Sequence, residues 1–333
     1  MSLSKRKLGT QGLEVGAVGL GCMGMSQSYG PADESESIAT LHRAIDLGCD
    51  FFDTAEGYGP YANEELLGSA FKDRRDQVVI ATKVGFRFEN GRQLGTDTDS
   101  RPDSVRRAVE GSLKRLQTDY IDLVYQHRLD RKVPIEEFAG VVGDLVKEGK
   151  VRFLGLCEVG IANLRRAHAT HPVSALQSEY SLWERNLEPE IIPVLQALGI
   201  GLVPFCPLGR GFMTGNVKRG EGYPESDTRR ADPRYQGANF DANVKAAQVV
   251  FDIAKSRNLK PGQIALAWLL GKGNFIVPIP GTKRRTYLEE NIAAEQVRLA
   301  EDDVQKLDAA LTAGTVCHFS PYSGHPFPAY TGQ

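Results

Sequence analysis

The sequence has 333 residues, of which 41% are hydrophobic, and a formal net charge of −2 at pH 7. A chain of this size can form one large barrel, and its near-neutral charge provides no field that favours nucleic acid or anionic membranes. The five cysteines show no C-x-x-C spacing, no apolar run is long enough to span a bilayer, and the N-terminus lacks the apolar segment of a signal peptide. We therefore expect a cytoplasmic protein without a bound metal.

The chain alternates between short apolar strands and amphipathic helices. Polar residues with glycine in the turn predict a β-hairpin over residues 5–15. Strands are predicted over residues 17–21, 51–53, 78–83, 121–127, 151–158, 175–181, 201–209 and 275–281. The first helix carries Ile38, Leu41 and Ile45 on one stripe. Further helices are predicted over residues 63–72, 102–116, 134–148, 161–169, 190–199, 244–258, 262–271, 285–294 and 301–313.

This alternation predicts parallel strands joined by helical crossovers. Eight strand–helix units favour a closed (β/α)8 TIM barrel over an open sheet, with the N-terminal hairpin and extra C-terminal helices added to it. No stretch has the composition of a linker, so residues 1–333 are expected to form a single barrel domain. The longest irregular stretches are residues 209–240 and the C-terminal tail, residues 314–333.

A glycine motif near the N-terminus favours a different fold. Residues 19–24 read Gly-Leu-Gly-Cys-Met-Gly and match the dinucleotide-binding pattern G-x-G-x-x-G, which is typical of a Rossmann-type dehydrogenase. A Rossmann motif opens directly into the helix whose N-terminus holds the pyrophosphate, whereas residues 25–35 intervene here. We therefore interpret the glycines as positions where backbone approaches a ligand at a barrel mouth.

Polar residues end three consecutive predicted strands. Asp53, Lys83 and His127 occupy these ends, and Tyr58 lies on the loop after Asp53. Neighbouring strands lie about 4.8 Å apart, so the four side chains are expected to share one volume at the carboxyl end of the barrel. Taken separately, Asp53 could cap a helix, Lys83 could be a solvated strand end, and His127 could be a satisfied polar residue.

Together the four residue types suit the reduction of a carbonyl group. When hydride arrives at carbon, negative charge develops on oxygen and a proton must be supplied. A phenol has a pKa of about 10 and becomes a better acid beside an ammonium group. Lys83 would therefore activate Tyr58, with Asp53 holding Lys83 in place. His127 would orient the carbonyl by a hydrogen bond, and no His-x-His pair or carboxylate cluster offers a metal-activated alternative.

Seven stretches together resemble the aldo-keto reductase family, and the resemblance covers nearly the whole chain. They are FFDTAEGYG (51–59), ATK (81–83), DLVYQHR (122–128), GKVRFLGLCE (149–158), QSEYSLWER (177–185), PFCPLGRGFMTG (204–215) and PIPGTKRRTYLEEN (278–291). The likeness is strongest to a branch that reduces many aldehydes and ketones. It implies a small-molecule carbonyl substrate, NADPH as the cofactor, and a catalytic tetrad of Asp53, Tyr58, Lys83 and His127 with Tyr58 as the general acid.

The resemblance also implies which residues hold NADPH. Gln177 would bind the nicotinamide carboxamide and Phe205 would stack on the ring. Residues 208–210 would follow the pyrophosphate, residues 281–284 would hold the 2′-phosphate, and residues 290 and 291 would lie near the adenine. The full expected set is Met23, Asp53, Cys157, Glu158, Gln177, Phe205, Pro207, Leu208, Gly209, Arg210, Gly281, Thr282, Lys283, Arg284, Glu290 and Asn291. Cys157 and Cys206 stand where the family usually has serine.

Three further expectations concern the surroundings of the site. The first third of the loop 209–240 is expected to fold over the cofactor as a lid. Met23, Tyr61, Phe86 and Trp183 are candidates for an apolar substrate cleft, with core packing as the alternative. The aromatic C-terminal tail could shape that cleft or dock on a second copy of the chain. Because some relatives of this fold keep the tetrad as cofactor-sensing regulatory subunits, a binding function is the alternative to catalysis.

Overall fold

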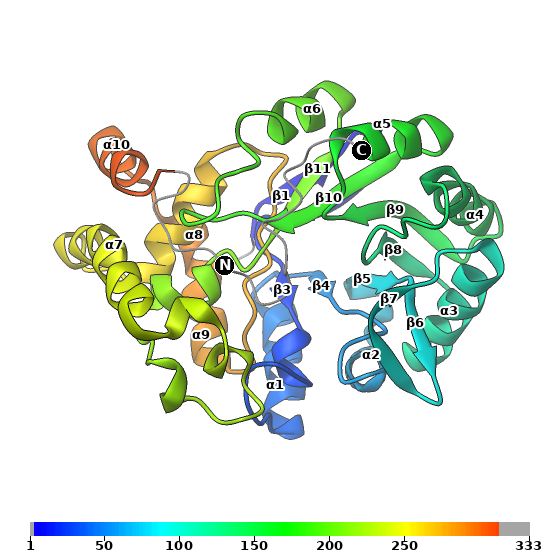
Figure 1. Cartoon of the computed structure of the whole chain (residues 1–333), viewed down its shortest axis with the longest axis horizontal. Helices are drawn as coiled ribbons and strands as arrows, with labels where there is room; N and C mark the ends of the chain where they lie inside the picture. Colours follow the sequence, from blue (N-terminus) through cyan, green and yellow to red (C-terminus); the bar gives the residue numbers. More distant parts are fainter. Residues whose placement is uncertain (1–2, 313–333) are drawn as a thin grey trace.

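The computed structural model describes residues 3–312, so the tail at residues 314–333 lies outside the described residues. Seven parallel strands form one sheet in the order β11–β10–β9–β8–β5–β4–β3, and helices surround it (Figure 1). The strands are β3 (Leu20–Gly21), β4 (Phe51–Asp53), β5 (Val79–Val84), β8 (Ile121–Gln126), β9 (Val151–Cys157), β10 (Val173–Glu179) and β11 (Gly201–Phe205).

An extended segment, residues 275–281, closes the gap between the edge strands β11 and β3. Leu202 N–H donates to the carbonyl of Phe275 at 2.8 Å, and Gly19 N–H donates to the carbonyl of Pro278 at 3.0 Å. Pro278 and Pro280 have no N–H, so this segment cannot form a regular ladder. The predicted TIM-barrel fold is confirmed, with its eighth strand reduced to bridging contacts, and a closed barrel excludes the Rossmann alternative.

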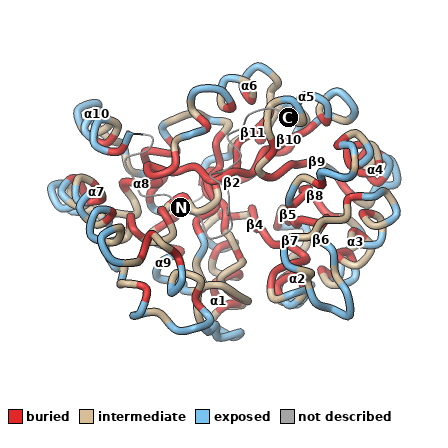
Figure 2. Tube along the Cα trace, viewed as in Figure 1, coloured by how far each residue is buried: buried red, intermediate tan, exposed pale blue. Residues whose placement is uncertain are grey.

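The helices cover the outside of the barrel, with buried inner faces and exposed outer faces (Figure 2). Asp33 begins the first helix because its carboxylate accepts the N–H of Glu36 at 2.8 Å. Pro102 is the first residue of the third helix. The helices are α1 (Glu34–Asp46), α2 (Ala62–Phe71), α3 (Pro102–Arg115), α4 (Ile135–Lys147), α5 (Ile161–Thr170), α6 (Ile191–Leu198), α7 (Gly237–Ser256), α8 (Pro261–Gly271), α9 (Arg285–Ala293) and α10 (Glu301–Ala310).

Two antiparallel hairpins lie outside the barrel sheet. The predicted N-terminal hairpin consists of β1 (Lys5–Leu8) and β2 (Leu13–Gly16). A second hairpin, β6 (Phe86–Glu89) and β7 (Arg92–Thr98), follows β5 and was not predicted. Its two-residue turn has positive φ at both Asn90 and Gly91 (50° and 74°), as a type I′ turn requires.

The barrel interior has its own apolar core, which determines where a ligand can enter. Leu8, Leu13 and Val15 of the N-terminal hairpin pack with interior strand residues such as Phe51 and Leu123. The hairpin therefore closes the amino end of the barrel. The carboxyl end, where Asp53 and Lys83 lie, remains as the mouth, as in other barrels of this class.

A long connection between β11 and α7 crosses the region of the mouth. It contains four 3-10 turns, η3 (Gly209–Thr214), η4 (Gly220–Gly222), η5 (Thr228–Arg230) and η6 (Pro233–Tyr235). We call residues 209–236 the cover loop. Helix α7 begins at Gly237, earlier than the predicted residue 244. The remaining short turns are η1 (Met23–Met25), η2 (Arg75–Gln77) and η7 (Ala294–Gln296).

Candidate active site

Lys83 lies at the centre of a buried hydrogen-bond cluster at the mouth. Its side chain is only 1% exposed and forms an ion pair with Asp53. The same ammonium group donates to the carbonyl of Thr54 at 2.8 Å and to the hydroxyl oxygen of Tyr58 at 3.0 Å. These three acceptors use all three donors of an ammonium group. Strands β4 and β5 and the loop after β4 thus fix Lys83 beside the phenol.

Burial and charge together set the protonation states in this cluster. Burial raises the pKa of Tyr58 to about 12, although the neighbouring Lys83 ammonium acts to lower it. Burial would lower the pKa of Lys83, but the Asp53 carboxylate outweighs it and the pKa is raised. At neutral pH the cluster therefore holds a protonated phenol in contact with an ammonium group.

His127 lies beside this phenol just beyond the end of β8. Its ring meets that of Tyr58 edge-on, with the centroids 5.8 Å apart, and Phe86 packs on it at 4.7 Å. Burial and the nearby charge of Arg128 hold the pKa of His127 well below 6.5, so the imidazole is neutral. Its Nδ1 is buried without a hydrogen-bond partner among the described residues. Because Nδ1 is buried and inaccessible to a ligand, Nε2 is the ring nitrogen that can form a hydrogen bond with a ligand in the mouth.

The next strands bring the residues expected around the nicotinamide to the same place. Gln177 on β10 donates its side-chain N–H to the second carboxylate oxygen of Asp53 at 2.6 Å. Cys157 at the end of β9 is packed in the apolar interior, and burial raises the pKa of its thiol to about 12. Glu158 accepts the N–H of Glu179 at 3.0 Å. Phe205 ends β11 next to β10, and Met23 belongs to η1 after β3.

The residues expected along the pyrophosphate begin the cover loop, directly after β11. Pro207 is buried, and Leu208 is half-buried before η3. Gly209 has φ 57° and approaches Trp183 so closely that a Cβ atom would lie 2.5 Å from the indole, which only glycine avoids. Arg210 forms an ion pair with Glu179 at 3.4 Å, while its Nε is buried without a hydrogen-bond partner in the described part of the chain.

The residues expected at the 2′-phosphate lie between the closing segment and α9. Gly281 bridges to Gly21, and the hydroxyl of Thr282 accepts the N–H of Arg284 at 3.1 Å. The Lys283 ammonium donates to three carbonyls in the loop before α1, at distances from 2.7 to 3.0 Å. Arg284 is exposed at the N-terminus of α9. Glu290 and Asn291 lie in the last two turns of this helix.

Sequence reasoning missed two features of the mouth. One is the β6–β7 hairpin, which brings Phe86 onto His127 and for which the Asn-Gly pair at residues 90 and 91 was the available signal. The other is the contact between the cover loop and the loop after β3, where Asp227 forms an antiparallel bridge with Tyr29. No short-range pattern in either loop indicates this contact, because nearly two hundred residues separate the partners.

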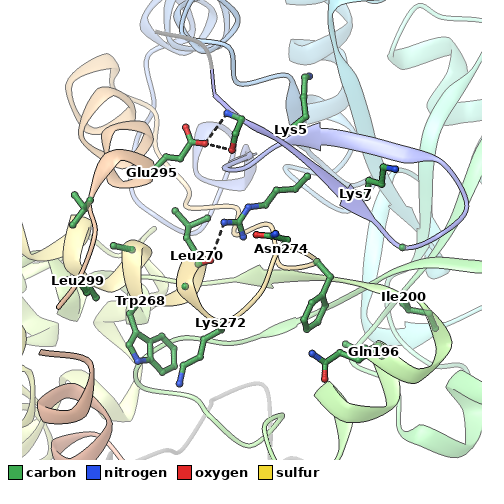
Figure 3. Close-up of a pocket in the computed structure, with 18 of the residues that line it drawn as sticks. Lys5, Lys7, Gln196, Ile200, Trp268, Leu270, Lys272, Asn274, Glu295 and Leu299 are labelled. Atoms are coloured by element: carbon green, nitrogen blue, oxygen red, sulfur yellow. Dashed lines mark hydrogen bonds between the residues drawn. The ribbon is translucent and has the colours of Figure 1, made fainter. Parts of the chain in front are cut away.

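A large cavity of about 1080 Å³ lies at the other end of the barrel (Figure 3). Lys5 and Lys7 on β1, Trp268 and Lys272 around the end of α8, and Glu295 are among the residues that line it. Arg6 also lines it and donates to the carbonyls of residues 270, 273 and 276 at 2.8–3.0 Å. None of the four tetrad residues lines this cavity, so we regard it as the seam between the hairpin and the barrel.

Residues 3–312 contain neither a metal-binding cluster nor a membrane-spanning helix. No group of three or more histidine, cysteine, aspartate or glutamate side chains in this range could hold a metal ion. No helix in the same range combines the length and the apolar character needed to cross a membrane.

Comparisons with known proteins agree with this geometry. Residues 17–312 match the family model described as the aldo/keto reductase family. The chain is 44% identical to a probable aldo-keto reductase 1 of Glycine max over 96% of this chain and 92% of that protein. It is 43% identical to the aldo-keto reductase yakc [NADP(+)] of Schizosaccharomyces pombe over 93% of this chain and 92% of that protein.

Solved structures show the same similarity. The glycerol dehydrogenase AKR11B4 of Gluconobacter oxydans superposes with a TM-score of 0.84 at 27% identity, over 93% of this chain and 96% of that one. The holo form of the aldo-keto reductase AKR11C1 of Bacillus halodurans superposes with a TM-score of 0.76 at 27% identity, over 93% and 97%. This protein belongs to the aldo/keto reductase family and is an oxidoreductase that acts on carbonyl compounds.

Proposed function

We propose that the protein reduces aldehydes or ketones to alcohols with NADPH and that Tyr58 is the general acid. The observation that carries this proposal is the hydrogen bond of 3.0 Å between Lys83 and the Tyr58 hydroxyl inside a buried cluster. A protonated phenol that touches a cation can release its proton as negative charge develops on a nearby carbonyl oxygen.

Each tetrad residue has a separate task in this proposal. Tyr58 transfers its phenolic proton to the carbonyl oxygen. Lys83 stabilises the phenolate that remains, because its ammonium group is held at the oxygen by Asp53. His127 is neutral and donates from Nε2 to the same carbonyl oxygen, which orients it. The alcohol is the product, and the reverse reaction would use the phenolate as the base.

The residues present fit a nicotinamide dinucleotide phosphate. The buried Nε of Arg210 lacks a partner in the described residues, and Lys283 and Arg284 place two cations at the N-terminus of α9. When bound, NADPH would supply the hydride. The Schizosaccharomyces pombe relative carries NADP(+) in its name, which supports the same cofactor here. Cys22, Cys49, Cys157 and Cys206 are free thiols, which suits the reducing cytoplasm that we propose as its location.

A screen of neutral aldehydes and ketones tests the proposal, with NADPH consumption followed by absorbance. We expect turnover of several simple aldehydes by the wild-type protein. The opposing result is tight NADPH binding without turnover of any carbonyl compound. That result would favour the alternative of a cofactor-sensing regulatory subunit that keeps the tetrad.

A further inference from the structure

Arg128 places an exposed positive charge directly after His127, at the end of β8. Its Nη1 donates to the carbonyl of His127 at 2.7 Å, and the side chain is exposed. Within residues 3–312, no carboxylate lies within 4.0 Å of the Arg128 guanidinium, whereas Arg210 and Arg234 at the same mouth both pair with Glu179. The other N–H groups of the Arg128 guanidinium therefore remain available to a ligand.

The charge of Arg128 acts on three groups that surround the predicted position of the substrate. These are the imidazole of His127, the thiol of Cys157 and the carboxyl group of Glu158. They belong to the ends of the neighbouring strands β8 and β9. Arg128 therefore lies at the rim of the mouth near these two strand ends, and the buried ammonium of Lys83 is a second cation in the same region. A carbonyl compound held by Tyr58 and His127 would lie near both cations.

In the described part of the chain, the acidic groups near this rim accept hydrogen bonds from backbone groups and form no ion pair with Arg128, although its charge acts on Glu158. Glu158 accepts the N–H of Glu179 at 3.0 Å, and burial raises the pKa of its carboxyl group. Asp130, two residues beyond Arg128, accepts the backbone N–H groups of Ser100 and Lys132 at 2.9 Å each. The rim beside His127 therefore offers an anion a planar guanidinium fork, the geometry that matches a carboxylate with two parallel hydrogen bonds.

We propose that Arg128 binds a carboxylate on the substrate, so that the preferred substrates are carbonyl compounds that also carry an acid group. This inference rests on the proposed reductase function and names its substrate class. The reacting carbonyl would lie at Tyr58 and His127, and the acid group would point outward to the rim. An exposed guanidinium can discriminate in this way because a neutral substrate leaves it fully hydrated, whereas a carboxylate replaces that water with charge-assisted hydrogen bonds.

The experiment compares two aldehydes of nearly the same shape, 4-carboxybenzaldehyde and its neutral methyl ester, each with NADPH. The readout is the ratio of kcat/KM for the acid to kcat/KM for the ester. Effects of a mutation on proton transfer or on NADPH binding cancel in this ratio, because both substrates share those steps. We expect the wild-type ratio to favour the acid by about tenfold or more, the range that a charge-assisted hydrogen bond implies, and to fall as salt is added.

Arg128→Gln should remove most of the preference for the acid over the ester, mainly through a higher KM for the acid. Arg128→Lys should restore part of the ratio, since it keeps the charge and loses the fork. Arg165→Gln is the matched control, because Arg165 is exposed on α5 outside the barrel and its loss removes the same charge. A wild-type protein without acid preference, or a ratio unchanged in Arg128→Gln, would overturn the inference. Failure to reduce even the ester would count against the reductase function instead.

Discussion

At the residue scale, the candidate site is a set of buried polar groups that stabilise one another. Lys83 and Asp53 are 1% and 2% exposed, and such charges are tolerated only when each is paired and hydrogen-bonded. Asp53 meets this need with Lys83 on one oxygen and Gln177 on the other. The arrangement leaves Tyr58 as the group of this cluster that can give up a proton to a ligand.

The first prediction concerns Tyr58 and pH. Tyr58→Phe should lower kcat about 10²- to 10⁴-fold, the usual cost of losing a positioned acid, while NADPH binding measured by fluorescence stays near normal. The pKa of about 12 means that the wild-type phenol stays protonated from pH 6 to 9. Because His127 is also neutral there, the rate of carbonyl reduction should be level over this range and fall only in strong alkali. Near-wild-type turnover in Tyr58→Phe would contradict the assignment.

The second prediction concerns Glu56, a buried carboxyl group that the proposed chemistry does not use. It is 3% exposed and accepts the N–H of Gly85 at 3.1 Å. Burial, with the charge of Glu64, raises its pKa to about 8, above the value of about 4.3 expected in the unfolded chain. Glu56 therefore destabilises the fold increasingly as pH rises from about 4.3 to 8.

Glu56→Gln keeps an acceptor for Gly85 and cannot ionise. Its melting temperature should exceed that of the wild type by several degrees above pH 8, and the difference should disappear near pH 5. Glu65→Gln provides the control, since Glu65 is an exposed glutamate on α2, the helix that follows the loop of Glu56. A difference that is constant from pH 5 to 9 would show that Glu56 does not titrate in this range.

At the element scale, strands and helices with a regular apolar pattern could be predicted from the sequence. Features that depend on contacts between distant segments could not. The strands that end on Asp53 and Lys83 were readable because buried parallel strands are continuous apolar runs. The start of α7 was missed because residues 237–243 (GANFDAN) carry only one large apolar side chain, Phe240, and their helix is stabilised by packing on the cover loop. The weak eighth strand contains two prolines whose carbonyls accept from Gly19 and Gly21 on the β3 side, while Val277 and Ile279 donate to β11.

The residues of the candidate site fall into the same two groups, those that a local pattern predicts and those whose contacts come from distant segments. The clustering of Asp53, Tyr58, Lys83 and His127 could be predicted because each lies at the end of a recognisable strand or soon after it, while their catalytic roles stay a prediction. Lys283 shows the limit of that approach. Its position in the chain predicts a phosphate contact, which stays a prediction. The sequence did not indicate that its ammonium group also donates to the carbonyls of residues 29–31. Only the folded structure brings that loop to the start of α9.

The third prediction tests the preference for NADPH at this element. Changing Lys283 and Arg284 together to Ala should raise the dissociation constant for NADPH by about tenfold or more through the lost charge-assisted contact of Arg284, and loss of the Lys283 charge near the phosphate should add to this. Binding of NADH, which lacks the 2′-phosphate, should weaken much less. Titration by fluorescence measures both constants. Arg285→Ala is a suitable control, because Arg285 is exposed and pairs with Glu36 instead. Equal losses for the two cofactors would mean that the pair supports the fold rather than the phosphate.

At the scale of the whole molecule, the cover loop joins two distant sides of the mouth. It leaves the end of β11 and reaches the loop after β3, where Thr228 N–H donates to the carbonyl of Ser28 at 2.9 Å. The guanidinium of Arg229 lies over the rings of Tyr29 and Tyr223, 5.1 and 4.1 Å from their centroids. A cofactor that extends from Arg210 to α9 would pass beneath this connection, so we expect the loop to open when the cofactor leaves.

The last prediction follows from that closure. Arg229 also pairs with Asp227 at 2.7 Å inside the cover loop. Arg229→Ala therefore removes the ring contact that holds the loop on Tyr29, together with the ion pair and the Tyr223 contact that fix Arg229 within the loop. Release of NADP⁺, measured by stopped-flow fluorescence, should accelerate roughly three- to thirtyfold, the range that cation–π contacts imply. Arg219→Ala is the control, since Arg219 belongs to the same loop and pairs with Asp241 at the surface. If release limits turnover, kcat should rise in Arg229→Ala while the hydride-transfer rate in a single turnover stays the same. An unchanged release rate in Arg229→Ala would show that the cofactor leaves without opening the contact between the cover loop and Tyr29.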